Sequence, residues 1–179
     1  MTPPIMLPEF QTERLFARPL KESDIDAMHT LHRNSNVMKY IHKPEETMEE
    51  TLATYKRVMD YHERNLQFGL WSVILKDGTY MGWIILKHLD NTADVEIGYR
   101  FLPEFWGKGY ATEIGHGVRD YGFQELELPT IVGVTLPENI ASQRVLEKIG
   151  LTYRKPAHYY GVDVSFYQME NPRERQTTS

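Results

Sequence analysis

The 179-residue sequence contains no cysteine, which excludes disulfides, thiolate metal ligands and cysteine nucleophiles. It also lacks a long apolar run: its longest stretches, such as Tyr80–Leu86, fall far short of the ~20 residues that a membrane-spanning helix needs. Positive charge is not in excess, because 20 Lys and Arg against 25 Asp and Glu give a net charge of −5. Met1–Phe10 lacks the basic and apolar regions of a signal peptide. We therefore expect a cytoplasmic protein with no nucleic-acid and no membrane partner.

Histidine is the remaining residue type that could hold a metal ion. None of the seven histidines belongs to a recognised ligand pattern such as H-E-x-x-H. His29 and His32 could share a helix face, but no carboxylate or third histidine follows them at a diagnostic interval. We expect no metal.

What the sequence does have is the composition of a globular protein, with 41% hydrophobic and 25% charged residues. Its length fits one domain. We expect an N-terminal extension over residues 1–11, a single domain over residues 12–170 and a polar tail over residues 171–179.

Hydrophobic periodicity and turn residues predict a mixed α/β (α+β) protein. Strands are expected at 14–20, 70–75, 80–87, 93–102, 131–134, 152–154 and 161–168. Helices are expected from about Ser23, at 47–64, at 107–124 and at 139–149, with caps at Ser23 and Thr47. The order β-α-α-β-β-β-α-β-α-β-β predicts a twisted, mostly antiparallel sheet of about seven strands with flanking helices.

A glycine-rich turn, residues 103–112, joins a predicted strand to a predicted helix and places Gly107 and Gly109 at the start of that helix. Unpaired N–H groups and the helix dipole at such a turn favour a phosphate ligand. A Walker A loop is excluded, since Gly109 follows Lys108, and Thr112 replaces the third glycine of a dinucleotide fingerprint. Two interpretations of this turn remain: a binding site for a single diphosphate group, or a glycine turn without a ligand.

Three segments together carry a family resemblance: TERLFARPLKESD, EIGYRFLPEFWGKGYATE and PENIASQRVLEKIGL. In their order and spacing they resemble the GNAT N-acetyltransferases of the RimJ/RimL type, and the similarity extends from Thr12 to Gln168. The resemblance implies the GNAT fold, acetyl-CoA as the acetyl donor and a primary amine as the acceptor.

The resemblance also assigns the residues that bind acetyl-CoA. The N–H groups of the turn would hold its pyrophosphate; they belong to Trp106, Gly107, Lys108, Gly109, Tyr110, Ala111 and Thr112. The main chain of Tyr99, Arg100 and Phe101 would pair with the pantetheine arm, beside a strand bulge expected near Gly98. N–H groups near Phe101 and Leu102 could polarise the thioester carbonyl. Glu104 departs from the family motif, which has Arg or Gln at that position.

Asn139 and Ser142 share one face of a predicted helix with Leu146, which stands where many GNAT enzymes have a tyrosine acid. By resemblance, Asn139 would bind the pantetheine amide, and Ser142 would contact or protonate the leaving sulfur. Their structural alternatives are an N-cap for Asn139 and a hydroxyl bonded to its own helix for Ser142. Glu96 is the candidate base or water-orienting group; its alternative is a solvent-facing carboxylate on a strand.

The acceptor is not specified by these motifs. The resemblance favours the α-amine of a protein N-terminus, ribosomal proteins included, with polyamines, aminoglycosides and amino-metabolites as alternatives. We expect the segments Asn34–Pro44 and Lys155–Gly161 to determine it. A non-catalytic acyl-CoA-binding module is the other class to consider. Aromatic residues in the last two predicted strands would permit a homodimer.

Overall fold

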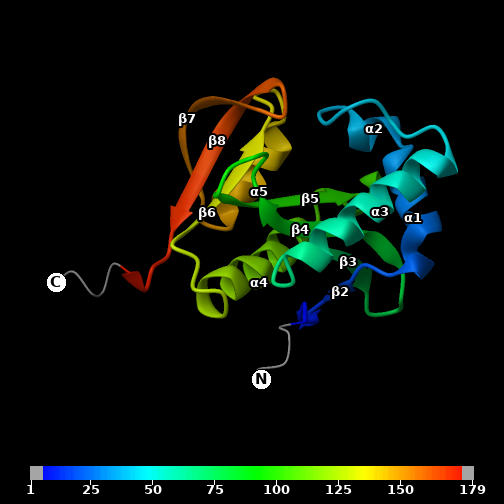
Figure 1. Cartoon of the computed structure of the whole chain (residues 1–179), viewed down its shortest axis with the longest axis horizontal. Helices are drawn as coiled ribbons and strands as arrows, with labels where there is room; N and C mark the ends of the chain where they lie inside the picture. The colour runs from blue at the N-terminus through cyan, green and yellow to red at the C-terminus, as the bar shows by residue number, and fades with distance from the viewer. Residues whose placement is uncertain (1–5, 175–179) are drawn as a thin grey trace. The chain divides into compact units, whose positions relative to one another are not determined.

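The computed structural model describes residues 6–174 and contains one eight-stranded sheet in the order β1-β2-β3-β4-β5-β6-β8-β7 (Figure 1). The strands are β1 (Phe10–Gln11), β2 (Leu15–Pro19), β3 (Gly69–Leu75), β4 (Tyr80–His88), β5 (Val95–Phe101), β6 (Thr130–Thr135), β7 (Thr152–Tyr159) and β8 (Val162–Glu170). The helices are α1 (Ile25–His32), α2 (Ser35–Met38), α3 (Met48–Arg64), α4 (Tyr110–Gln124) and α5 (Ile140–Lys148), with 3-10 turns η1 (Glu22–Asp24) and η2 (Pro103–Phe105).

The predicted fold class is confirmed: the sheet is mixed and mostly antiparallel. Strands β5 and β6 pair in parallel, with Glu96 opposite Val132. The eighth strand is β1, which has two residues and lies in the expected N-terminal extension. Parts of that extension and of the expected tail lie outside the described residues.

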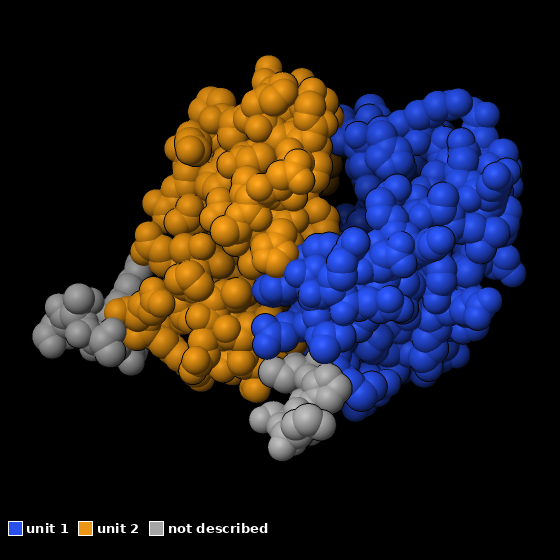
Figure 2. Space-filling model, in the orientation of Figure 1, with its two compact units in different colours: residues 1–85, 99–110 blue, residues 86–98, 111–179 orange. Residues whose placement is uncertain are grey.

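The chain forms two compact units (Figure 2). Unit 1 comprises Met1–Ile85 and Tyr99–Tyr110, and unit 2 comprises Leu86–Gly98 and Ala111–Ser179. In unit 1, helices α1 and α3 pack against each other and against the sheet. The apolar core beneath them contains Leu20, Met28, Leu31, Val37, Met38, Leu70, Trp83 and Ile85. In unit 2, Leu89, Val132 and Phe166 form a smaller core around β6 and β8.

Local sequence signals predict several element ends correctly. The Thr47 hydroxyl accepts the N–H of Glu50, and the Glu50 carboxylate accepts the N–H of Thr47, which completes the expected capping box of α3. Gly78 takes a φ of 93° in the predicted hairpin turn between β3 and β4, and Gly150, at 102°, follows α5.

The expected cap at Ser23 is wrong. The chain instead enters the 3-10 turn η1 after Lys21, whose N–H donates to the Asp24 carboxylate at 2.9 Å. Asp24 is buried, and its carboxylate also accepts hydrogen bonds from Arg18, at 2.7 and 2.8 Å, and from the Ser72 hydroxyl, at 2.9 Å. These bonds compensate the carboxylate for its loss of water. A tertiary ion pair therefore sets this helix start, and the local cap signal is overridden.

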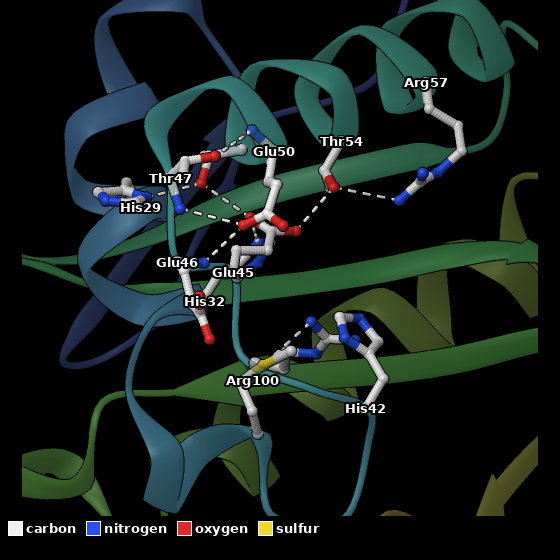
Figure 3. Close-up of polar contacts among 12 residues, drawn as sticks. His29, His32, His42, Glu45, Glu46, Thr47, Glu50, Thr54, Arg57 and Arg100 are labelled. Carbon is white, nitrogen blue, oxygen red and sulfur yellow. Dashed lines mark hydrogen bonds and ion pairs between the residues drawn. The ribbon is translucent and has the colours of Figure 1, made fainter.

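A buried polar network lies between α1, α3 and β4 in unit 1 (Figure 3). The indole N–H of Trp83 donates to His32 Nε2 at 2.9 Å, so the His32 proton must reside on Nδ1, which donates to Glu45 at 3.1 Å. Burial lowers the pKa of His32 to about 4, so the ring is neutral at pH 7. Burial alone would raise the pKa of Glu45, but hydrogen bonds from Thr54 and Thr51 bring it below its ordinary value.

This network predicts loss of stability in acid. His32 binds a proton near pH 6.5 in the unfolded state but only near pH 4 in the folded state. Proton binding therefore stabilises the unfolded state relative to the folded state as the pH falls between these two values. Between pH 7.5 and pH 5 we expect the free energy of unfolding to fall by about 2 kcal/mol from His32, at about 1.4 kcal/mol per pKa unit. Urea titrations at both pH values measure it.

The matched variants are His32→Gln, which should lose this share of the pH dependence, and His158→Gln, whose side chain is 64% exposed and which should keep it. Equal pH dependence in all three proteins would show that His32 is not the group responsible.

Candidate active site

The glycine turn before α4 is open to a ligand. Gly107 and Gly109 have φ values of 71° and 80°, a backbone region that residues with a Cβ rarely adopt. An added Cβ at Gly107 would meet no heavy atom within 4 Å. Because α4 begins at Tyr110, the first N–H groups of that helix lack intrahelical acceptors. This is the main-chain surface that the sequence assigns to the pyrophosphate of acetyl-CoA. The Trp106 N–H, one of the expected donors, is occupied, because it donates to the Pro103 carbonyl at 3.1 Å.

Two side chains hold the turn in place within unit 1. Arg14 donates to the Lys108 carbonyl at 2.9 Å and lies over the Tyr110 ring at 4.3 Å. The indole N–H of Trp106 donates to the Phe101 carbonyl at 2.7 Å, which ties the turn to the end of β5. The sequence assigns no role to the Arg14 side chain, although it belongs to the first family segment. Glu104 is exposed in η2.

Successive residues of β5 direct their main-chain N–H and C=O groups to opposite sides of the strand. The four residues expected to contact pantetheine and the thioester therefore fall into two pairs, one directed toward β4 and one away from it. The Leu102 N–H donates to the Met81 carbonyl at 2.9 Å. The Arg100 carbonyl also faces β4, since an added Cβ at Gly82 would lie 2.0 Å from it. Tyr99 and Phe101, one residue out of phase, direct their main-chain groups away from β4.

This geometry corrects part of the expectation for the thioester. The N–H of Leu102 is occupied by β4 and cannot polarise the carbonyl in this conformation. Of the two N–H groups expected at the thioester, only that of Phe101 is directed away from β4. Gly82, which the sequence analysis passes over, is what permits the close approach of β4 to β5.

Helix α5 in unit 2 presents Asn139 and Ser142. The Asn139 side-chain oxygen accepts the Ser142 N–H at 3.2 Å, so the N-cap role is confirmed. Within residues 6–174 the amide nitrogen of Asn139 has no protein partner, so it is free to donate to a ligand carbonyl. Ser142 is half-buried, and Leu146 is buried against Gly133.

Glu96 is buried in unit 2, so the alternative of a solvent-facing strand carboxylate is wrong. Its Oε1 accepts the Tyr160 hydroxyl and lies 2.8 Å from Lys87 Nζ. Burial, together with the charge of Glu96, raises the pKa of Tyr160 well above its ordinary value, so this phenol donates. Both donors use Oε1. In the described part of the chain, Oε2 has no protein partner and remains available to accept a proton or to orient a water molecule.

Tyr160 belongs to the segment Lys155–Gly161, which the sequence analysis treats as an acceptor loop. Most of that segment is strand: β7 extends to Tyr159, and only the turn at Tyr160 and Gly161 precedes β8. The other acceptor segment contains α2, whose N-cap Asn34 accepts the N–H groups of the first turn. Neither α2 nor the extension of β7 to Tyr159 is predicted from the sequence.

The expected site residues divide between the units. Unit 1 holds Tyr99, Arg100, Phe101, Leu102 and the turn as far as Tyr110, and unit 2 holds Glu96, Ala111, Thr112, Asn139 and Ser142. Residues 6–174 contain no group of three or more His, Asp or Glu side chains placed to hold a metal ion. Over the same residues, no helix is long and apolar enough to cross a membrane.

Comparison with known proteins agrees with this geometry. The acetyltransferase (GNAT) domain family matches residues 14–152. The uncharacterized N-acetyltransferase YnaD of Bacillus subtilis is 36% identical over 142 residues, which cover 78% of this chain and 80% of that protein. Spermidine N(1)-acetyltransferase of Escherichia coli is 31% identical over 140 residues, which cover 75% of this chain and 71% of that enzyme.

The fold has a close match among solved structures. An acetyltransferase from Agrobacterium tumefaciens has a TM-score of 0.81 at 26% identity, over 93% of this chain and 96% of that one. The glycine turn, the sheet and the matched segments lead to the same assignment: the chain belongs to the GNAT family of N-acetyltransferases, in its RimJ/RimL-like group, and uses acetyl-CoA as its acetyl donor.

Proposed function

We propose that this enzyme acetylates a primary amine by direct attack on acetyl-CoA, and that the acceptor is the α-amine of a protein N-terminus, ribosomal proteins included. Family membership supports the enzyme over the non-catalytic acyl-CoA-binding module. The observation that carries the mechanism is the Glu96 carboxylate, held by Lys87 and Tyr160 at Oε1 and free at Oε2. Direct attack also suits a chain that has no cysteine to carry the acetyl group.

The proton transfers follow from these groups. An α-amine has a pKa near 8, so much of it is protonated at neutral pH and must lose a proton before it attacks. Glu96 Oε2 takes that proton, directly or through one water molecule. The C–N bond forms as the C–S bond breaks, and the Ser142 hydroxyl or a water molecule that it orients protonates the leaving sulfur. Acetyl-CoA supplies the activated acyl group, and Phe101 N–H is the donor proposed for its carbonyl.

A small amine is the second candidate acceptor. It is favoured by the 31% identity to an enzyme that is named for spermidine. Release of CoA, followed with a thiol reagent, separates the candidates when N-terminal peptides, polyamines, amino acids and aminoglycosides are compared. The assay has no protein background, because the chain contains no thiol. CoA release with peptides alone would support the protein N-terminus as the acceptor. Release with polyamines alone would identify a small amine as the acceptor instead, and no release with any amine would refute both candidates.

Ser142→Ala tests the thiolate step. We expect acetyl-CoA affinity within about threefold of wild type and kcat lower by about 10- to 100-fold, since one proton donor to the leaving group is lost. Isothermal titration and steady-state rates measure the two quantities. Ser165→Ala on β8 is the matched control. Unchanged turnover in Ser142→Ala would remove this hydroxyl from the mechanism.

A further inference from the structure

Arg100 has a side chain whose charge the mechanism above does not use. Its guanidinium lies over the Trp83 ring at 4.8 Å, and its Nη1 lies 3.5 Å from the Met38 sulfur. Figure 3 shows the position of Arg100 below Glu45 and beside His42. Trp83 and Met38 are both buried members of the unit 1 core. The planar cation is therefore held on an apolar surface that fixes its orientation.

The N–H donors of Arg100 lack strong acceptors. Within residues 6–174 the Met38 thioether, a weak acceptor, is the sole hydrogen-bond partner of this guanidinium. The side chain is half-buried, and its unpartnered nitrogens are not sealed from solvent, since the only fully buried unpaired side-chain atom in that range is the Tyr80 hydroxyl. Burial lowers the pKa of Arg100 to about 10, the mark of a cation with incomplete compensation.

The Glu45 carboxylate does not fill this gap. Glu45 attracts Arg100 electrostatically, but its oxygens accept hydrogen bonds from His32 at 3.1 Å, Thr51 at 2.8 Å and Thr54 at 2.7 Å. Glu45 is thus fixed on α1 and α3, and the guanidinium fork has no carboxylate from the described chain. A planar guanidinium fork matches the two oxygens of a carboxylate.

The position of Arg100 connects it to the acceptor. Its main chain lies in the part of β5 expected to run beside pantetheine, and its side chain contacts Met38 in α2, within the segment Asn34–Pro44. That segment contains Lys39, His42 and Lys43 and no acidic residue. Lys43 is already paired with Glu46 at 3.0 Å, so the attraction for a carboxylate and the repulsion of a polyamine rest on Lys39 and Arg100.

We propose that Arg100 binds a carboxylate of the acceptor, so that the preferred substrate is an amine that also carries a carboxylate. This inference rests on the proposed acetylation of a primary amine, and it adds a free amino acid to the protein N-terminus as a candidate acceptor. Two sources supply the same chemistry: a free amino acid, through its own carboxylate, and a peptide whose first residue is Asp or Glu. Arg100 is then a specificity-determining residue, and an amine without the carboxylate binds more weakly.

The experiment compares acceptors in pairs in which an amide replaces the carboxylate, with KM expressed per neutral amine. The pairs are alanine with alaninamide, 4-aminobutyrate with 4-aminobutyramide, and peptides that begin with Asp and with Asn; spermidine is added. KM and kcat are measured, and isothermal titration measures acceptor binding in the presence of CoA. For at least one pair, we expect the acid to have a KM about 10- to 100-fold below that of its amide, as for a charge-assisted hydrogen bond. The pair that shows the preference identifies the source of the carboxylate.

Arg100→Met should abolish the preference, mainly through KM, and Arg100→Lys should keep only part of it, because a lysine lacks the planar fork. Arg64→Met is the matched control: this exposed arginine ends α3, and its loss should leave the preference intact. Thermal melting shows whether each variant folds.

Three results would overturn the inference: no preference in any pair, a preference that survives Arg100→Met, or equal loss for acids, amides and spermidine. Failure of the proposed function looks different. In that case no amine releases CoA, and the titrations still decide whether acids bind better than amides and whether Arg100→Met removes the difference.

Discussion

Replacing Glu96 by Gln is expected to lower kcat by about 10²- to 10⁴-fold, the contribution usual for a general base. Gln has nearly the same shape, and its carbonyl oxygen can still accept from Lys87 and Tyr160 at the Oε1 position. What disappears is the group at Oε2 that takes the proton of the attacking amine. Acetyl-CoA binding should change little, because the predicted donors to its pyrophosphate are main-chain N–H groups of the glycine turn.

The pH profile separates this role from a structural one. Without the base, only amine that is already neutral reacts, so the rate of Glu96→Gln should keep rising with pH up to the pKa of the acceptor amine. Asp163→Asn is a matched control on β8, where the carboxylate is 91% exposed, and should retain the wild-type profile. A Glu96→Gln variant with an unchanged profile would eliminate Glu96 as the base, whatever its rate.

The second large effect concerns Gly82→Ala. At this position φ is 151°, and an added Cβ would lie 2.0 Å from the Arg100 carbonyl oxygen and 2.8 Å from the Phe101 Cα. Both neighbours are main chain, so no side-chain movement relieves the overlap. We expect at least about 3 kcal/mol of lost stability, which corresponds to a fall in Tm of about 6 to 12 °C.

In this variant we expect weaker binding of acetyl-CoA in addition to the loss of stability. Relief of the clash requires β5 to shift at Arg100 and Phe101, the strand segment proposed to bind the pantetheine arm, so the KM for acetyl-CoA should rise at temperatures where the protein is folded. Gly117→Ala in α4 is the control, since its Cβ would meet no atom within 4 Å and should stabilise the helix by up to about 1 kcal/mol. Equal melting temperatures for the two variants would contradict the assigned role of Gly82.

The fold was predictable where local chemistry decides it. The Asp77-Gly78 turn and the Thr47 capping box need only neighbouring residues, and both formed as expected. Strand β7 was underestimated, because its side chains are mostly exposed and show no apolar alternation; its pairing with β8 defines it instead. The cap at Ser23 failed for a related reason, since Arg18 and Ser72 recruit Asp24 from a distance.

The site divides in the same way. The glycine turn and the N-cap Asn139 could be found in the sequence, because each depends on a short contiguous segment. The environment of Glu96 could not, since Tyr160 lies 64 residues away along the chain and reaches Glu96 only through the turn between β7 and β8. The Arg100 guanidinium without a carboxylate partner in the described chain could not be found either, because it depends on which donors the oxygens of Glu45 accept from.

Direct attack is the central claim, and a single-turnover experiment tests it most directly. The enzyme is mixed with acetyl-CoA in the absence of any acceptor, CoA release is followed with a thiol reagent, and the intact mass of the protein is recorded before and after an accepted amine is added. We predict no release and no acetylated protein until the amine arrives, then CoA and N-acetyl product in equal amounts. A burst of CoA without amine, together with a protein that carries the acetyl group and passes it on, would contradict direct attack.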